Sequence, residues 1–187
     1  MTSLILASQS PRRRQLLEQV GLTFTVKPSS TEEIFDKNMN PEDLVQKLAR
    51  EKAADVFQQF PEAVVLGSDT VVAADGEVLG KPKDDADAKN MLRMLSGRTH
   101  QVHTGAVILS KGRETSFAET VNVTFYPLTE TEIDTYIQSR EPEDKAGSYG
   151  IQGLGAVFVK RIEGDYFSVV GLPVAGVVRA LKEHGLG

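Results

Sequence analysis

The chain is organised around residues Val64 to Lys83, which read VVLGSDTVVAADGEVLGKPK. Its first three residues are apolar, which is enough for a buried strand and too few for a helix. We expect this strand to end at residues 67–70, so that Asp69 lies where open α/β sheets hold their active sites. Asp75-Gly76 then predicts a hairpin turn, and Lys81 follows in a segment that Pro82 keeps from being helical. An acid and an amine near one hairpin predict a site for metal and phosphate, with a solvated turn as the alternative.

The residues before this stretch predict a second part of an anion site. Leu4–Ala7 reads as a buried strand, and Ser10 followed by Pro11 is typical of a helix start. The helix should run from Arg12 to Val20, with arginines at 12, 13 and 14 in its first turn. Cations are unfavourable at that end of the helix dipole unless a bound anion removes the penalty. We therefore interpret this end as phosphate-binding, with a solvated basic patch as the alternative.

A long amphipathic helix is predicted from Asn40-Pro41 to Gln59. Lys52 falls inside its apolar stripe, where an ammonium group needs a partner or loses its proton. The pattern predicts a carboxylate or phosphate partner for Lys52, although its stem could instead carry the charge out to solvent. Glu32 and Glu33 lie in the preceding loop, where acidic residues are usually just solvated.

The second half of the chain alternates helices and strands. We expect a helix from Asp84-Asp85 to Leu95, strands at 98–110 and 114–126, and a capping-box helix at 129–139. A glycine-rich loop follows at 141–155, in which Gln152 has a donor and an acceptor suited to a base edge, though a plain connector is equally compatible. A hairpin of 156–162 with 166–170 and a helix from Pro173 to His184 complete an α/β pattern.

Composition excludes several classes of protein. The 187 residues carry a net charge of −5, so no overall positive field draws the chain to nucleic acid or to anionic membranes. The absence of cysteine excludes disulfides, thiolate metal sites and a cysteine nucleophile. His100 and His103 should point to opposite faces of a strand, as core or rim residues rather than shared ligands. Without a membrane-length apolar run or a signal-peptide pattern, we expect a cytoplasmic protein.

Five motifs in order along nearly the whole chain resemble those of the Maf family, nucleoside triphosphate pyrophosphatases that are also called septum-formation inhibitors. They are Ser8-Gln9-Ser10-Pro11-Arg12-Arg13, Ser68-Asp69-Thr70, Gly80-Lys81-Pro82, Leu95-Ser96-Gly97-Arg98-Thr99-His100 and Gly147-Ser148-Tyr149-Gly150-Ile151-Gln152-Gly153. The resemblance implies a mixed, twisted α/β sheet with flanking helices in two lobes around a deep cleft, related to the inosine triphosphate pyrophosphatases. It implies one domain over residues 1–187, a divalent cation (Mg²⁺ or Mn²⁺) and, in many members, a homodimer.

The resemblance also assigns roles to single positions. Asp69 matches the catalytic acid that serves as proton acceptor, and Lys52 and Lys81 match polar residues of the active site. The remaining positions are substrate-binding or metal-binding: Ser8, Arg12, Arg13, Thr70 and Gln152 for the substrate, Asp69 and Glu33 for the metal. Arg12, Thr70 and Gln152 match the branch that acts on dTTP and UTP rather than on 7-methyl-GTP. The adjacent Glu32 and Glu33 leave the second acid ambiguous by one position.

Our hypothesis is metal-dependent hydrolysis of dTTP or UTP to the monophosphate and pyrophosphate. Such chemistry depends on placement and charge neutralisation, and Asp69 could act either as general base or as metal ligand. Two alternatives remain open: a division regulator that acts through a protein partner, and a phosphomonoesterase that releases inorganic phosphate. A nucleic-acid binder is the least favoured reading, because the chain is acidic and no aromatic residues cluster beside its basic run.

Overall fold

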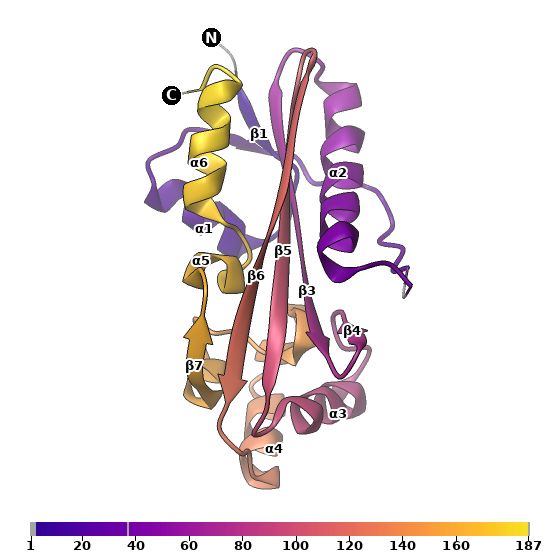
Figure 1. Cartoon of the computed structure of the whole chain (residues 1–187), viewed down its shortest axis with the longest axis vertical. Helices are drawn as coiled ribbons and strands as arrows, with labels where there is room; N and C mark the ends of the chain where they lie inside the picture. Colours follow the sequence, from indigo (N-terminus) through magenta and orange to yellow (C-terminus); the bar gives the residue numbers. More distant parts are fainter. Residues whose placement is uncertain (1–2, 37, 187) are drawn as a thin grey trace. The chain divides into compact units, whose positions relative to one another are not determined.

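The computed structural model describes residues 3–36 and 38–186, and these divide into two compact units. The first unit comprises the residues up to Thr70, then Thr104–Glu119 and the residues from Gly171 onward. The second comprises Val71–His103 and Thr120–Val170. Three long strands contribute residues to both units (Figure 1): β3 (Val64–Ala74), β5 (Thr99–Ser110) and β6 (Arg113–Phe125). The two units agree with the two lobes expected from the resemblance, while a single domain over residues 1–187 stays a prediction.

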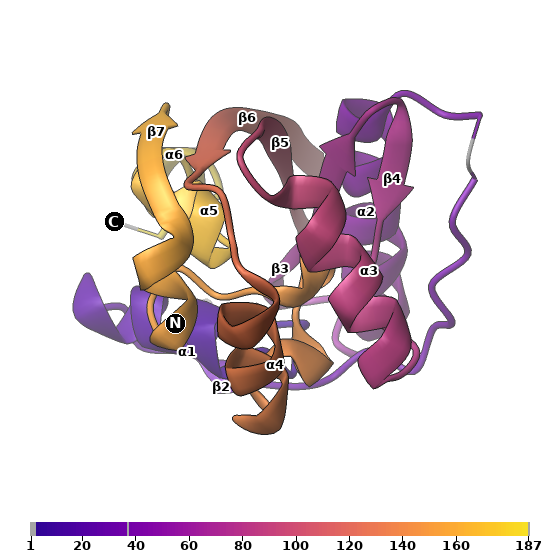
Figure 2. The same cartoon turned by 90° about the horizontal axis from the view of Figure 1, so that it is seen from below.

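The sheet of the first unit follows the order β2-β1-β3-β5-β6, in which β1 is Leu4–Leu6 and β2 is Thr25–Val26. Strand β1 pairs in parallel with both of its neighbours, Leu6 lying opposite Leu66 of β3. Figures 1 and 2 show α2 on one side of these strands and α1 and α6 on the other. These helices are α1 (Pro11–Gln19), α2 (Pro41–Gln59) and α6 (Val174–Glu183). The expected mixed α/β sheet with flanking helices is therefore confirmed.

Two glycines let α2 lie directly on the sheet. A Cβ atom at Gly67 would stand 2.2 Å from the carbonyl oxygen of Ala49, and one at Gly105 would stand 2.6 Å from that of Val45. Both approaches are far below van der Waals contact, so any side chain at either position would push the helix away. This close packing brings the helix face that carries Lys52 against β3.

One strand boundary that the sequence predicts is wrong. Strand β3 does not end at residues 67–70, because it continues through Asp69 and the β-branched Val71 and Val72 to Ala74. What ends there is the parallel pairing with β1, whose last bond runs from the amide of Ala7 to the carbonyl of Leu66 at 2.8 Å. Asp69 therefore lies within a continuous strand, just beyond the carboxyl end of the parallel pair.

The sheet of the second unit joins β4 (Glu77–Leu79) and β7 (Val159–Glu163) to the three long strands. The predicted hairpin turn is confirmed, since Asp75 and Gly76 have φ values of 50° and 78° between β3 and β4. Helices α3 (Asp85–Leu95) and α4 (Glu130–Gln138) pack on one another (Figure 2), and α4 starts with the predicted capping box. Residues 141–158 contain three 3₁₀ turns, Glu141–Asp144, Ala146–Ser148 and Leu154–Phe158.

An aromatic cluster forms part of the core of the second unit. The ring of Phe125 meets those of His100 and Tyr149 edge-on, at centroid distances of 4.9 and 4.7 Å. His100 Nε2 is hydrogen-bonded to the Tyr149 hydroxyl at 2.7 Å, while its Nδ1 is buried without a partner among the described residues. Of the core or rim positions expected for His100 and His103, the core is the one observed, since both residues are buried.

The predicted hairpin between 156–162 and 166–170 is wrong. Residues 156–158 belong to a 3₁₀ turn, and Tyr166–Val170 forms the short helix α5 instead of a strand. The carboxylate of Asp165 accepts hydrogen bonds from both the amide and the hydroxyl of Ser168, at 2.8 and 2.5 Å. A side chain that caps the first helical turn in this way outweighs the strand propensity of the aromatic and β-branched residues.

Candidate functional site

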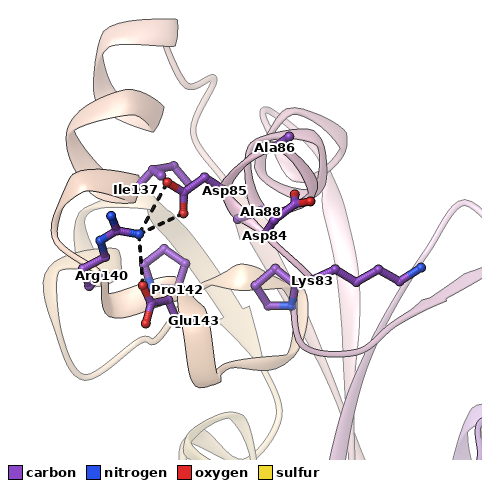
Figure 3. A pocket seen from close by; sticks show the side chains of 10 residues that line it. Lys83, Asp84, Asp85, Ala86, Ala88, Ile137, Arg140, Pro142 and Glu143 are labelled. Carbon is purple, nitrogen blue, oxygen red and sulfur yellow. Dashed lines mark hydrogen bonds and ion pairs between the residues drawn. The ribbon is translucent and has the colours of Figure 1, made fainter.

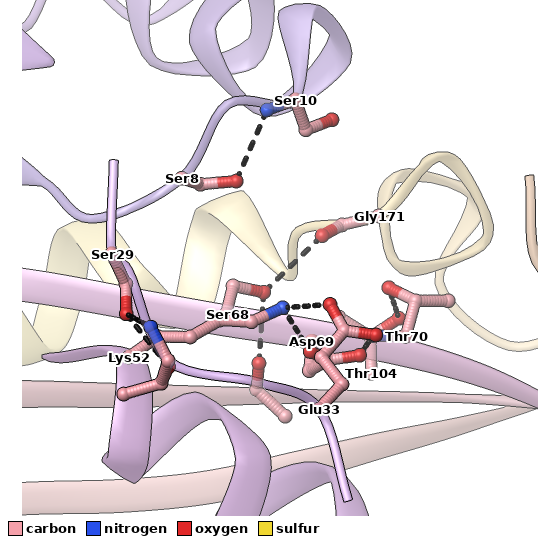
Figure 4. Close-up of polar contacts among 12 residues, drawn as sticks. Ser8, Ser10, Ser29, Glu33, Lys52, Ser68, Asp69, Thr70, Thr104 and Gly171 are labelled. Atoms are coloured by element: carbon pink, nitrogen blue, oxygen red, sulfur yellow. Dashed lines mark hydrogen bonds and ion pairs between the residues drawn. The ribbon is translucent and has the colours of Figure 1, made fainter. Parts of the chain in front are cut away.

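The first unit holds a partly buried ammonium group between two carboxylates. Lys52 Nζ donates to Glu33 Oε1 at 2.7 Å and also to Asp69 Oδ2 (Figure 4). The side chains of Lys52 and Asp69 are only 14% and 6% exposed, so both charges lie largely out of water. The predicted carboxylate partner of Lys52 is thus present, and of the adjacent pair Glu32 and Glu33 it is Glu33 that makes this contact.

The loop that carries Glu33 is held along α2 by Asp55, one helical turn beyond Lys52. The Asp55 carboxylate accepts bonds from the hydroxyls of Ser29 and Ser30 and from the amide of Ser30, the last at 2.8 Å. The amide of Ser30, ahead of the hydroxyls, lowers the pKa of Asp55, so it stays charged near neutral pH. This attachment places Glu33 within reach of Lys52.

Arg13 forms the second charged feature of this unit. The Ser10 side chain caps α1 and accepts from the amide of Arg13 at 3.5 Å, as the sequence predicts. The Arg13 guanidinium is buried and donates to the carbonyl of Gly171 at 2.7 Å, to Ser8 Oγ at 3.3 Å and to Thr70 Oγ1 at 3.0 Å. Burial lowers the pKa of Arg13, and the charge of Asp69 opposes that shift. Arg13 is therefore a cation fixed in position near the Asp69 carboxylate.

Strand β3 supplies hydroxyl groups on the face opposite Asp69. Ser68 Oγ donates to the carbonyls of Gly105 and Gly171, at 2.8 and 3.3 Å, and the Thr70 hydroxyl is hydrogen-bonded to that of Thr104 at 2.9 Å. Sequence reasoning missed Thr104 and the Gly171 carbonyl, because no spacing links them to Arg13 or Thr70. Successive side chains of a strand point to opposite faces. Asp69 therefore faces α2, whereas Ser68 and Thr70 lie on the other face of β3, where Arg13 is held.

The carboxylates of Asp69 and Glu33 suit a divalent cation. Their oxygen atoms converge on one ammonium group, which marks a place where positive charge is stabilised. Hard oxygen donors are the ligands that Mg²⁺ and Mn²⁺ prefer, and Mg²⁺ is usually held by one or two carboxylates plus substrate phosphates. Within residues 3–36 and 38–186 no group of three Asp, Glu, His or Cys side chains could hold a metal. Asp69 and Glu33 are thus the two residues that could contribute carboxylate ligands to such a cation.

The structure brings together six of the predicted site residues in the first unit: Ser8, Arg13, Glu33, Lys52, Asp69 and Thr70. Arg12 lies beside Arg13 on α1 and is half-buried. The other two, Lys81 and Gln152, lie in the second unit, where both are exposed. Their part in the site stays a prediction.

The second unit also has a surface pocket of about 690 Å³, lined by residues 82–86 and Ala88 of the α3 start and by Ile137, Arg140, Pro142 and Glu143. In this pocket Arg140 donates to both Asp85 and Glu143 at 3.2 Å (Figure 3).

Comparison with known proteins places the chain in a family. The family model described as Maf-like protein matches residues 3–184. The chain belongs to the Maf-like protein family. Two relatives of this Maf-like chain are named dTTP/UTP pyrophosphatase. The relative from Bacillus pumilus is 54% identical, and the aligned region covers 100% of this chain and 98% of the relative. The one from Halalkalibacterium halodurans is 52% identical, with 99% and 97% covered.

A solved structure supports the fold of this Maf-like protein. The Ham1 protein of Staphylococcus aureus superposes with a TM-score of 0.51 and 13% identity, covering 98% of this chain and 100% of that one. At this identity the likeness shows the fold alone. In the described part of the chain, all helices are too short or too polar to cross a membrane.

Proposed function

We propose that this Maf-like protein hydrolyses nucleoside triphosphates, dTTP and UTP by preference, to the monophosphate and pyrophosphate. The observation that carries the proposal is the partly buried Lys52 ammonium between Asp69 and Glu33, in the same unit as the fixed guanidinium of Arg13. Full-length relatives that carry the name dTTP/UTP pyrophosphatase support the substrate class. The same name favours this reaction over the division-regulator and phosphomonoesterase alternatives.

The reaction is a single displacement at the α-phosphorus. Water forms a new P–O bond, the bridging bond between the α- and β-phosphates breaks, and pyrophosphate leaves. Asp69 accepts the proton that the attacking water loses. Because Asp69 is almost completely buried, bulk water cannot take its place as the proton acceptor. No bond to the protein is needed, so the contribution of the protein is position and charge.

Three cations act on the charge of the substrate in this proposal. Lys52 and Arg13 are held by protein oxygens before substrate arrives, so little reorganisation is needed when negative charge moves onto the leaving group. Arg12 follows Pro11 at the start of α1, where the helix dipole adds positive potential for the polyphosphate. These features explain why basic residues are tolerated at the unfavourable end of this helix.

The remaining predicted residues complete the proposal. Asp69 and Glu33 would hold Mg²⁺ or Mn²⁺, which when bound supplies neutralisation of phosphate charge and a lower pKa for coordinated water. Thr70 and Gln152 would read the pyrimidine, since polar groups that a wrong base leaves unpaired reject that base. Lys81 would add a further positive charge for the leaving pyrophosphate.

The test is product analysis on the full chain. The wild-type protein with Mg²⁺ or Mn²⁺ should release pyrophosphate from dTTP and UTP, and excess EDTA should stop the release. Asp69→Asn should lower kcat by about 10³-fold or more while the protein stays folded. Asp75→Asn is the matched control, because this aspartate closes the same strand but pairs with Arg98 in an exposed ion pair. Inorganic phosphate as first product, or normal turnover by Asp69→Asn, would refute the assignment.

A further inference from the structure

One carboxylate fastens the glycine-rich segment that carries Gln152. Glu141 Oε2 accepts the amide of Leu154 at 2.8 Å, and its Oε1 accepts the amide of Gly155 at 3.1 Å. The Tyr136 hydroxyl donates to the same Oε1 at 2.9 Å and accepts the amide of Gly150 at 3.1 Å. Hydrogen bonds therefore hold the backbone on both sides of Gln152. Glu141 accepts directly from Leu154 and Gly155, and the Tyr136 hydroxyl links it to Gly150.

The contacts require a carboxylate at this position. Three donors reach the two oxygens of Glu141, and a glutamine side chain would turn an NH₂ group toward at least one of them. Burial opposes ionisation of Glu141, but the amides of Leu154 and Gly155 outweigh it and lower the pKa of the carboxyl group. At Gly153, an added Cβ would come within 2.3 Å of Oε2, so a larger residue there would require the Glu141 carboxylate to move.

We propose that Glu141 is a positioning residue for substrate selection, because it fixes the backbone on both sides of Gln152 and so sets how that amide meets the nucleobase. The inference rests on the proposed function and extends it to a residue that makes no contact with the phosphates in that scheme. The Gln152 side chain is exposed, so the backbone that carries it sets the position from which the amide reaches a base. Loss of the Glu141 contacts then acts on discrimination between bases rather than on the chemical step.

The experiment compares Glu141→Gln with Glu143→Gln. Glu143 lies on the same 3₁₀ turn, and its carboxylate pairs with Arg140 in the pocket of Figure 3, so Glu143→Gln matches the change in charge. We expect the ratio of kcat/KM for dTTP to that for dATP to fall about tenfold in Glu141→Gln, mainly through the KM for dTTP. The ratio should be unchanged in Glu143→Gln. A merely structural role cannot lower this ratio, because the folded fraction of enzyme cancels from it.

Gln152→Ala provides the reference for a lost base contact. If its ratio falls while that of Glu141→Gln stays at the wild-type value, the inference is overturned, and an unchanged ratio in both variants overturns it as well. If Glu141→Gln does not fold, Tyr136→Phe removes the hydroxyl between Glu141 and Gly150 and should also lower the ratio; an unaltered ratio there counts against the inference. A wild-type protein that releases no pyrophosphate from any triphosphate would instead refute the proposed function.

Discussion

The buried ring of His100 makes a quantitative prediction about pH. Desolvation lowers the pKa of His100 from 6.5 to about 4 in the folded protein, because the ring is packed against Phe125 and one of its nitrogens is buried without a partner among the described residues. In the unfolded chain the same ring binds a proton with its ordinary pKa of 6.5. The unfolded state thus takes up more protons between pH 6.5 and 4, so acid favours unfolding.

The magnitude follows from the two pKa values. The stabilisation due to a neutral His100 is present above pH 6.5 and is lost as the pH falls towards 4. Linkage gives a loss of about 2 kcal/mol in the free energy of unfolding between pH 7 and pH 5, and about 3 kcal/mol by pH 4. A change of that size is a large part of the stability of an ordinary domain.

The assay is urea unfolding, followed by circular dichroism at pH 7, 6 and 5, on the wild-type protein and on His100→Gln. Glutamine does not titrate and still offers the Tyr149 hydroxyl a hydrogen-bond partner. Other groups with lowered pKa values, such as His184, titrate in both proteins and cancel in the difference. We expect the pH 7 to pH 5 loss to be about 2 kcal/mol smaller in the variant. Equal losses in the two proteins would refute the reasoning.

Two further predictions concern the first unit. Gly67→Ala should lower the free energy of unfolding by about 3 kcal/mol, because its Cβ would stand 2.2 Å from the Ala49 carbonyl; a variant as stable as the wild type in urea melts would disprove the close packing. Lys52→Met should cost about 3–5 kcal/mol at pH 7, because it removes the cation that contacts both the buried Asp69 carboxylate and Glu33. Combining Lys52→Met with Asp69→Asn should recover part of this loss in a double-mutant cycle, and strictly additive costs would exclude the ion pair as their cause.

Features with local causes could be predicted from the sequence. Ser10-Pro11, Asn40-Pro41 and the Thr129-Glu132 capping box fix helix starts through contacts within four residues, and the structure has all three helices where these signals place them. The partner of Lys52 could also be predicted, because an ammonium group on a buried helix face is costly without one. Only the identity of that partner, Glu33 together with Asp69, needed the fold.

Features that depend on distant segments could not be predicted. The length of β3 depends on pairing that continues after β1 has ended, so the apolar run Val64–Leu66 alone marked the wrong boundary. The helix at Tyr166–Val170 is capped by the Asp165 side chain. The aromatic and β-branched residues of this segment favour a strand, so sequence propensity alone predicted the wrong element. The hydrogen-bond partners of Arg13 could not be predicted for the same reason, since Thr70 lies 57 residues further along the sequence.

The bond from Arg13 to the carbonyl of Gly171 spans 158 positions of sequence. A ribosome that has released the whole of α1, α2 and β3 has still not made the acceptor that holds this guanidinium. Nascent chains that have not yet reached Gly171, or chains truncated before it, should accordingly carry Lys52, Asp69 and Glu33 without this acceptor for Arg13.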